Sequence, residues 1–201
     1  LFGLYLLVGQ LSATQFQAAR EENAAAALGE AKAALIGDAI SRLSVNDAGY
    51  LRYPDLGSIE GQSAGTFLDD GKGLSVVGKF PWQTLKTTVP GDAQRECLWY
   101  VVSGYIKNHA WKGETWKTHP LNWDSEGQID LIDGKGQVIA KNLAALVVAP
   151  GRALDGQDRA LADATYTECG GNYDAQNYLD PIEIDNAIAG KVNYFAKSLN
   201  G

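Results

Sequence analysis

Two groups of side chains in the middle of this sequence have the types that metal or acid–base chemistry requires. His109 and His119 flank a Trp-rich segment, and the carboxylates of Asp124, Glu126 and Asp130 follow it. Two imidazoles could begin a metal site, and two carboxylates could act as a general acid and a general base. A metal site needs further ligands, however, and carboxylates beside a hairpin are usually solvated. We therefore interpret these five residues as loop and surface residues.

The short motifs of common hydrolases and nucleotide-binding enzymes are absent from the sequence. It contains no G-x-S-x-G nucleophile elbow and no H-E-x-x-H zinc motif. Gly71-Lys72 lacks the earlier glycine and the following Ser or Thr that a P-loop needs. We expect no catalytic residues, no metal and no cofactor, so that the protein is not an enzyme. An envelope hydrolase is the alternative that we favour least.

The sequence contains two cysteines, Cys97 and Cys169, and no methionine. A structural zinc site takes four ligands, which two cysteines cannot supply alone. The simplest use of the pair is one disulfide, which would indicate an oxidising compartment, and two buried free thiols are the alternative. The missing initiator Met predicts a processed or trimmed chain.

Three tryptophans, Trp111, Trp116 and Trp123, lie in a segment between two predicted strands. Exposed indoles in a loop can stack on sugar rings or anchor a partner protein, because Trp is enriched at the energetic centres of interfaces. The interpretation that we favour is that these side chains cover the sheet as part of the core. Trp82 and Trp99 lie in more apolar surroundings and are predicted core residues.

These residues must be positioned by a helix and a sheet. The first forty-odd residues contain no proline and predict one long helix that ends near residues 44–49. Its apolar opening, residues 1–11, is shorter than the about 20 residues that span a bilayer. We interpret it as the last part of a longer membrane helix, and a merely buried helix end is the alternative. We divide the chain into a stalk, residues 1–23, and a head, residues 24–201.

The second half of the predicted helix has an amphipathic pattern. Spacings of three and four residues place one set of apolar side chains on a single face. Glycines inside the helix each cost up to about 1 kcal/mol, and they mark places for close helix approach, bending or melting. The face consists of Leu28, Ala31, Leu35, Ala39, Ile40 and Leu43, and the glycines are Gly3, Gly9, Gly29 and Gly37.

Strand patterns follow in the second half of the chain. Residues 98–103 are rich in aromatic and β-branched types, and an Asp133-Gly134 turn joins residues 128–132 to residues 137–140 as a hairpin. The apolar run 143–149 predicts a central strand covered on both faces. One helix followed by three or four antiparallel strands, without a βαβ alternation, predicts an α+β fold.

The remaining segments carry weaker patterns. Residues 50–80 contain turn-forming sequences and predict an irregular connection. The region after Pro150 is predicted to be rich in loops, with a short helix over about residues 181–199. The chain of 201 residues has a net charge of -7, which argues against a nucleic-acid partner, because such proteins carry a basic surface.

Five segments, in order, resemble a group of type IV pilin-like proteins that carry the prepilin N-terminal methylation signal. The resemblance implies a long N-terminal helix packed on a small antiparallel sheet. Each segment is a weak match alone, but together they cover most of residues 28–160. They are residues 30–37 (EAKAALIG), 53–55 (YPD), 78–85 (GKFPWQTL), 98–103 (LWYVVS) and 147–151 with 156–159 (VVAPG and GQDR).

The sequence departs from this group at several points. Tyr53 stands where the group often has a cysteine, so a Cys97–Cys169 disulfide would substitute for the usual one. Residues 56–61 carry too few carboxylates for the six or more oxygen ligands of calcium. The methylation signal and its glutamate would lie ahead of Leu1.

The resemblance implies a structural subunit of a type IV pilus-like extracellular filament. The precursor would be anchored in the inner membrane, and the partners would be copies of the chain or other pilin subunits. A pseudopilin of a type II secretion system, or a membrane-tethered adhesin that binds carbohydrate, are the alternatives. The filament-core contacts would be Leu1, Phe2, Leu4, Leu6, Leu7, Val8 and Leu11, with Gly3 and Gly9 as bending or melting points.

Overall fold

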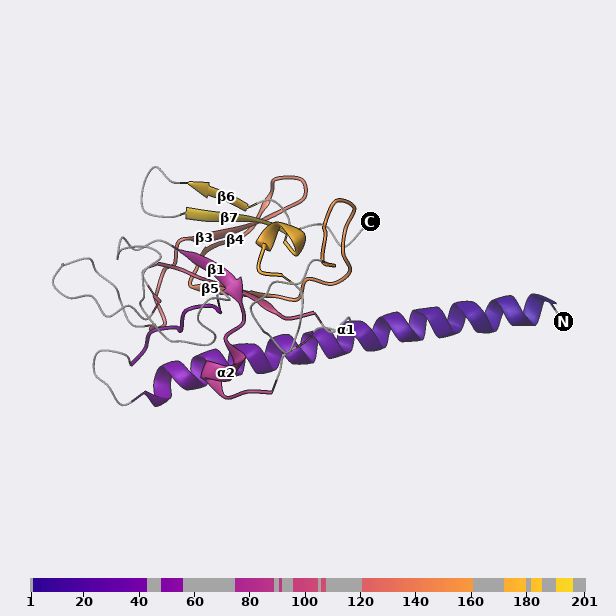
Figure 1. Ribbon diagram of the computed structural model, residues 1–201, viewed down its shortest axis with the longest axis horizontal. Helices are drawn as coiled ribbons and strands as arrows, with labels where there is room; N and C mark the ends of the chain where they lie inside the picture. Colours follow the sequence, from indigo (N-terminus) through magenta and orange to yellow (C-terminus); the bar gives the residue numbers. More distant parts are fainter. Residues whose placement is uncertain are drawn as a thin grey trace.

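The computed structural model describes part of the chain. The described residues are 2–42, 48–55, 75–88, 91, 96–104, 106–107, 121–160, 172–179, 182–185 and 191–196. Its first element is helix α1 (Phe2–Ser41), 40 residues long, which corresponds to about 60 Å at 1.5 Å per residue. Half of this helix projects away from the rest of the protein, with the N-terminus at the free end (Figure 1). The predicted long helix is therefore confirmed, although it ends at Ser41, before the predicted stop.

A three-stranded antiparallel sheet lies beside the C-terminal half of α1. It consists of β1 (Val76–Lys79), β2 (Trp99–Val102) and β5 (Ala145–Val148), with β2 in the middle. The prediction of a strand within residues 98–103 is confirmed. The prediction that the run 143–149 forms the central strand is wrong, because β5 lies at the edge of this sheet. Both faces of β5 are nevertheless packed against apolar clusters. An apolar run therefore predicts that a strand is buried, but not its position in the sheet.

One narrow stripe of α1 packs on this sheet. Ala31, Leu35 and Ala39 are buried at spacings of four, in one cluster with Tyr100 and Val102 of β2. These helix positions confirm most of the predicted apolar face. Among the described residues of that face, the exception is Ile40, which is 76% exposed, because it lies about 100° around the helix from Ala39. Leu43 lies outside the described residues.

A second sheet has four strands in the order β4-β3-β7-β6. The predicted hairpin is confirmed as β3 (Ile129–Asp133) and β4 (Val138–Leu143), which pair antiparallel around the turn. Strands β6 (Ile182–Asp185) and β7 (Lys191–Ala196) also pair antiparallel, but β7 runs parallel to β3. This sheet is therefore mixed, and not antiparallel throughout as predicted.

The prediction of a short helix over about residues 181–199 is wrong, because this region contains strands β6 and β7. The alternation in Ile-Glu-Ile-Asp and the cluster Val-Asn-Tyr-Phe favour strands over helices. The prediction of an irregular connection over residues 50–80 is also incomplete, because it missed β1. Two further short helices are α2 (Trp82–Leu85) and the 3₁₀ helix η1 (Ala175–Asn177).

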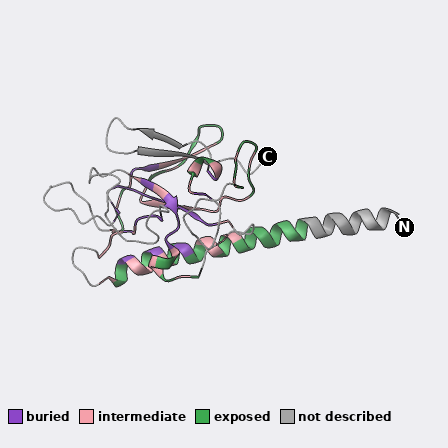
Figure 2. Cartoon of the chain, in the orientation of Figure 1, coloured by how far each residue is buried: buried purple, intermediate pink, exposed green. Residues whose placement is uncertain are grey.

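Strand β2 separates two apolar clusters of an α+β fold. Tyr100 and Val102 face α1, whereas Trp99 and Val101 pack with Ile129, Tyr178 and Leu179 on the opposite side. Successive side chains of a strand point to opposite faces, so one short strand anchors both clusters. Burial is concentrated around this strand and on one side of the C-terminal half of α1 (Figure 2).

Candidate functional site

The projecting part of α1 is the most exposed helical surface of the described chain. Every side chain from Thr14 to Asn23 is exposed, and Phe16 is 69% exposed. Among the helix residues whose side chains are described, the first half-buried one is Ala24. Figure 2 shows half-buried and buried residues only on the part of α1 that runs beside the head. Residues 2–13 belong to the same helix, and their side chains lie outside the described part of the structure. Among the described residues, no helix combines the length and apolarity that crossing a bilayer requires.

An ionic clamp fixes the C-terminal part of α1 to the segment that follows it. Arg52 donates two hydrogen bonds to the Asp38 carboxylate, from Nε at 2.9 Å and from Nη2 at 3.1 Å. Arg42 forms an ion pair with the same carboxylate at 3.0 Å and donates to the carbonyl oxygen of Tyr50. Tyr100 donates from its hydroxyl to the Arg52 carbonyl at 3.1 Å, which ties the clamp to β2. The planar guanidinium of Arg52 suits such paired recognition of a carboxylate.

A groove of about 500 Å³ runs between α1 and α2, directly beside the clamp. Lys86 lies at its edge, in the left-handed conformation (φ 55°) that ends α2. The Thr84 hydroxyl is buried and has no hydrogen-bond partner among the described residues. The lining residues are Ala34, Gly37, Asp38, Ser41, Arg52, Thr84, Leu85, Lys86 and Thr87. The groove is therefore lined by both apolar and polar groups, and it contains two cationic side chains in a chain whose net charge is -7.

On the other side of the head, two of the pilin-like segments meet in a buried polar cluster. Asp55 and Lys79 exchange backbone hydrogen bonds of 2.8 and 2.9 Å, and both residues are buried. Tyr173 donates from its hydroxyl to Asp55 Oδ2 at 2.8 Å, and Lys79 Nζ lies 4.3 Å from the centre of the Tyr173 ring. A cation over an aromatic face is stabilised without an exposed counter-ion. These segments therefore hold the region around Tyr173 against the sheet.

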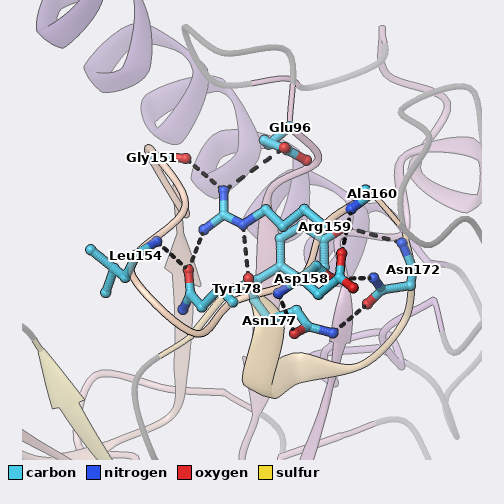
Figure 3. Close-up of polar contacts among 10 residues, drawn as sticks. Glu96, Gly151, Leu154, Asp158, Arg159, Ala160, Asn172, Asn177 and Tyr178 are labelled. Carbon is cyan, nitrogen blue, oxygen red and sulfur yellow. Dashed lines mark hydrogen bonds and ion pairs between the residues drawn. The ribbon is translucent and has the colours of Figure 1, made fainter.

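Arg159 organises the neighbouring turn, as Figure 3 shows. Its guanidinium donates to the carbonyl oxygens of Asn177 at 2.8 Å and Gly151 at 2.7 Å, and to Gln157 Oε1 at 2.9 Å. It also lies 3.8 Å from Glu96 Oε1 and 4.8 Å from the centre of the Tyr178 ring. Arg159 therefore joins residues 151 and 157 of this turn to residue 177.

Cys97 is buried and takes part in a disulfide. The sequence offers Cys169 as its only intrachain partner, and Cys169 lies outside the described residues. A disulfide from Cys97, next to β2, would complement the Arg159 and Tyr173 contacts in holding the C-terminal region to the sheet.

Trp123 is 95% exposed, at the tip of a turn. Ser125 closes this turn, since its hydroxyl donates to Asn122 Oδ1 at 2.6 Å and accepts from the Asn122 amide at 2.8 Å. The favoured interpretation that these tryptophans cover the sheet is therefore wrong for Trp123. Trp111 and Trp116 lie outside the described residues. Of the two predicted core tryptophans, Trp99 is buried and Trp82 is half-buried.

The candidate acid–base and metal residues do not form a site in the described structure. Asp124 and Glu126 are exposed, and Asp130 accepts a hydrogen bond from the Asn142 amide at 3.1 Å. His109 and His119 lie outside the described residues. Within the described part of the chain, no group of three His, Cys, Asp or Glu side chains could hold a metal ion.

Lys107 is a buried titratable residue that the sequence patterns did not indicate. Its Nζ lies 5.3 Å from the centre of the Tyr53 ring, and its segment forms a parallel bridge with Leu51. Burial lowers the pKa of Lys107 to about 7, and burial likewise raises the pKa of Tyr53. Tyr53 thus packs against a buried amine.

The groove and its clamp were also missed from the sequence. The i, i+4 spacing of Asp38 and Arg42 was visible, but Arg52 and Lys86 come from separate segments that only the fold brings together. Comparison with models of protein families, with curated proteins and with solved structures found no match.

Proposed function

We propose that the chain is a structural subunit of a type IV pilus-like extracellular filament, in which the N-terminal helices pack together and the heads lie outside. The observation that carries the proposal is that α1 extends beyond the head with every side chain from Thr14 to Asn23 exposed. Before assembly, the subunit would be anchored in the inner membrane through the same helix. The resemblance of five segments to pilin-like proteins supports this assignment.

The sequence of the projecting helix explains why it needs a partner. In proteins, most of the stability of a helix comes from packing of its apolar face against other elements. At about 100° per residue, the apolar residues Phe2, Leu4, Tyr5 and Leu7 are distributed around all sides of the helix. Each buried large apolar side chain contributes roughly 1.5–3 kcal/mol. A bundle of identical helices, or a bilayer before assembly, would bury this surface on all sides.

The glycines of α1 fit the same arrangement. An added Cβ at Gly29 or Gly37 would meet nothing within 4 Å, so neither glycine is required by packing inside the monomer. Small residues allow another helix to approach closely. Gly3 and Gly9 in the stalk remain the proposed places for bending or melting.

A deletion experiment tests the proposal. The full chain should sediment as filaments, whereas the chain without residues 1–11 should remain a soluble monomer with the same head. The control is Trp123→Ala in the full chain, because this exposed head residue should not affect assembly. Filaments formed by the deletion variant would contradict the proposal. A pseudopilin of a type II secretion system would use the same helix, and identifying the assembly machinery that exports the chain would separate the two assignments.

A second candidate function is carbohydrate binding by the head, and the exposure of Trp123 favours it. A fixed turn that presents an indole beside Asp124 offers a stacking surface for a sugar ring and a hydrogen-bond acceptor for its hydroxyl groups. On a glycan array, Trp123→Ala should lose binding and Trp123→Phe should retain part of it. Equal binding by the wild type and Trp123→Ala would exclude this role for Trp123.

A further inference from the structure

We infer that the groove between α1 and α2 receives the Glu22 carboxylate of a second copy of this chain. The inference rests on the proposed filament function and names the contact between neighbouring subunits. The groove and Glu22 lie on different parts of one helix, so the contact is head-to-tail. Such a contact does not close into a dimer when the copies are related by a translation, and it then generates an open filament.

The charges of the groove favour an acidic occupant. Asp38 is its only carboxylate, and this side chain is shared between Arg42 and Arg52. Among the residues that line the groove, Lys86 adds a second cation to Arg52, and it makes no ion pair within the described part of the chain. One carboxylate of the lining therefore faces two cations, in a protein that is acidic as a whole. Complementary charges of this kind select the partner and its register.

The uncharged groups of the groove also suit a carboxylate. The Thr84 hydroxyl is buried without a hydrogen-bond partner among the described residues, and rotation about its χ1 could present it as a donor. The serine and threonine side chains at residues 41 and 87 add further hydroxyls to the lining. Gly37 forms an open part of the wall, since nothing lies within 4 Å of an added Cβ. The backbone of a neighbouring helix can approach closely at such a position.

Glu22 is placed to reach a neighbour and not its own head. It is exposed, and it lies 13 residues before Leu35, which corresponds to about 140° around the helix from that buried position. The adjacent Glu21 accepts a hydrogen bond from Gln17 at 3.2 Å. Glu22 makes no ion pair among the described residues. The Glu22 carboxylate is therefore more available than that of Glu21 for a contact with another subunit.

The position of the two surfaces fixes the stagger of the subunits. Glu22 precedes the groove residue Asp38 by 16 positions on a continuous helix, or about 24 Å along the axis. Two parallel copies of α1, displaced by that distance, would place Glu22 of one copy beside Lys86 of the next. The same displacement repeats for every added subunit, and each interior subunit uses both surfaces.

Charge-reversal variants of the full chain test this contact. Lys86→Glu and Glu22→Lys should each raise the concentration needed for filament formation by roughly tenfold, and the double variant should return to within about twofold of the wild type. The matched controls are Lys32→Glu and Glu30→Lys, which change exposed charges of the same helix outside the groove. Thr84→Val should weaken assembly in the same direction. Circular dichroism of each monomer would verify that the fold is retained.

A zero-length carbodiimide cross-linker gives a direct measurement on wild-type filaments. It should join Lys86 of one copy to Glu22 of another, and this bond should be absent from dilute monomer. Wild-type filaments without the cross-link, or single reversals that assemble like the Lys32→Glu control, would overturn the inference and leave the filament proposal intact. A full chain that forms no filaments would instead contradict the proposed function, and the inference would fall with it.

Discussion

Asp38 of the long helix accepts two hydrogen bonds from Arg52, a residue 14 positions later in the chain. The two side chains are about one-sixth exposed, so water screens their interaction only in part. Their pairing joins the end of α1 to the segment that leads into the head. Since this segment also pairs with β1 through Asp55, the clamp couples helix and sheet.

We expect Asp38→Asn to destabilise the head. The substitution keeps the size of the side chain but removes the charge that pairs with Arg42 and Arg52, so the free energy of unfolding should fall by about 1–3 kcal/mol. Urea denaturation followed by tryptophan fluorescence would measure the change. Glu30→Gln, an exposed change on the same helix, should lie within about 0.5 kcal/mol of the wild type. Equal midpoints for both variants would exclude a stabilising clamp.

Arg159→Lys should loosen residues 172–179 specifically. Lysine keeps the charge but cannot reproduce the fork that reaches the carbonyl oxygens of Asn177 and Gly151. Because these hydrogen bonds are lost, the free energy of unfolding should fall by roughly 2–3 kcal/mol. Hydrogen–deuterium exchange should quicken in η1 and remain unchanged in β1. Arg152→Lys, on an exposed neighbour, is the matched control, and identical exchange in both variants would contradict this role of Arg159.

The stability of the protein should rise with pH above neutrality because of Lys107. Burial lowers the pKa of Lys107 to about 7, against 10.5 for an ordinary lysine. Between these values the unfolded chain binds more protons at this site than the folded chain, so the free energy of unfolding increases with pH. The slope from this site is at most about 1.4 kcal/mol per pH unit. Below pH 7 the amine is protonated in both states, and the slope disappears.

Lys107→Met should abolish this rise when urea midpoints are compared at pH 7.0, 8.0 and 9.0. Lys135→Met, on an exposed turn, should retain it. The measurements should stay below pH 10. Burial raises the pKa of Tyr53 and of Tyr100, so that above pH 10 these tyrosines ionise in the unfolded chain but not in the folded one, which lowers the free energy of unfolding. A wild type and a Lys107→Met variant with parallel pH profiles would show that Lys107 does not titrate in this range.

Peptide mapping without reduction should recover Cys97 linked to Cys169. The chain-entropy account predicts that closing a loop of about 70 residues contributes roughly 4 kcal/mol. Reduction, or Cys97→Ala, should therefore lower the free energy of unfolding by about 2–4 kcal/mol and expose one thiol to a colorimetric reagent in the variant. Two reactive thiols in the unreduced wild type would contradict the pairing.

Gly29→Ala and Gly127→Ala should change the free energy of unfolding in opposite directions. At Gly29 an added methyl group meets nothing within 4 Å, and alanine favours a helix, so the monomer should gain about 0.5–1 kcal/mol. At Gly127 the methyl group would overlap the backbone carbonyl of Leu143, and the hairpin would have to move. Thermal unfolding would measure both changes. A stabilising Gly127→Ala would show that this close approach is not required.

The sequence predicted the elements that have a long or regular pattern. Spacings of four residues identified Ala31, Leu35 and Ala39 as core positions, and Asp133-Gly134 identified the β3–β4 hairpin. It did not predict that β7 joins β3 in parallel, because this pairing brings together residues far apart in the chain. The alternation in β6 covers only four residues, and β7 is held by its pairing with β3 and β6, which the local sequence does not reveal.

The residues of the candidate surfaces were harder to predict. Asp38, Thr84 and Lys86 lie in segments whose sequence alone gives no reason to place them together, and only the packing of α2 on α1 forms their groove. The segments quoted for the resemblance were recognised only as sequence motifs. In the structure, three of their residues, Asp55, Lys79 and Arg159, make polar contacts within the chain. A motif shows that residues recur, whereas the fold shows whether they bind a partner or hold the chain together.

Helix α1 passes from the projecting end into the head without a loop or hinge between them. A pulling force on the free end therefore reaches the head along the helix axis, as shear across the contact with β2 and the Arg52 clamp. Shear loads the apolar stripe and the ion pairs at the same time, whereas peeling would break them in turn. In the proposed filament, the continuous helix would transmit a stretching force along the fibre axis directly into these contacts.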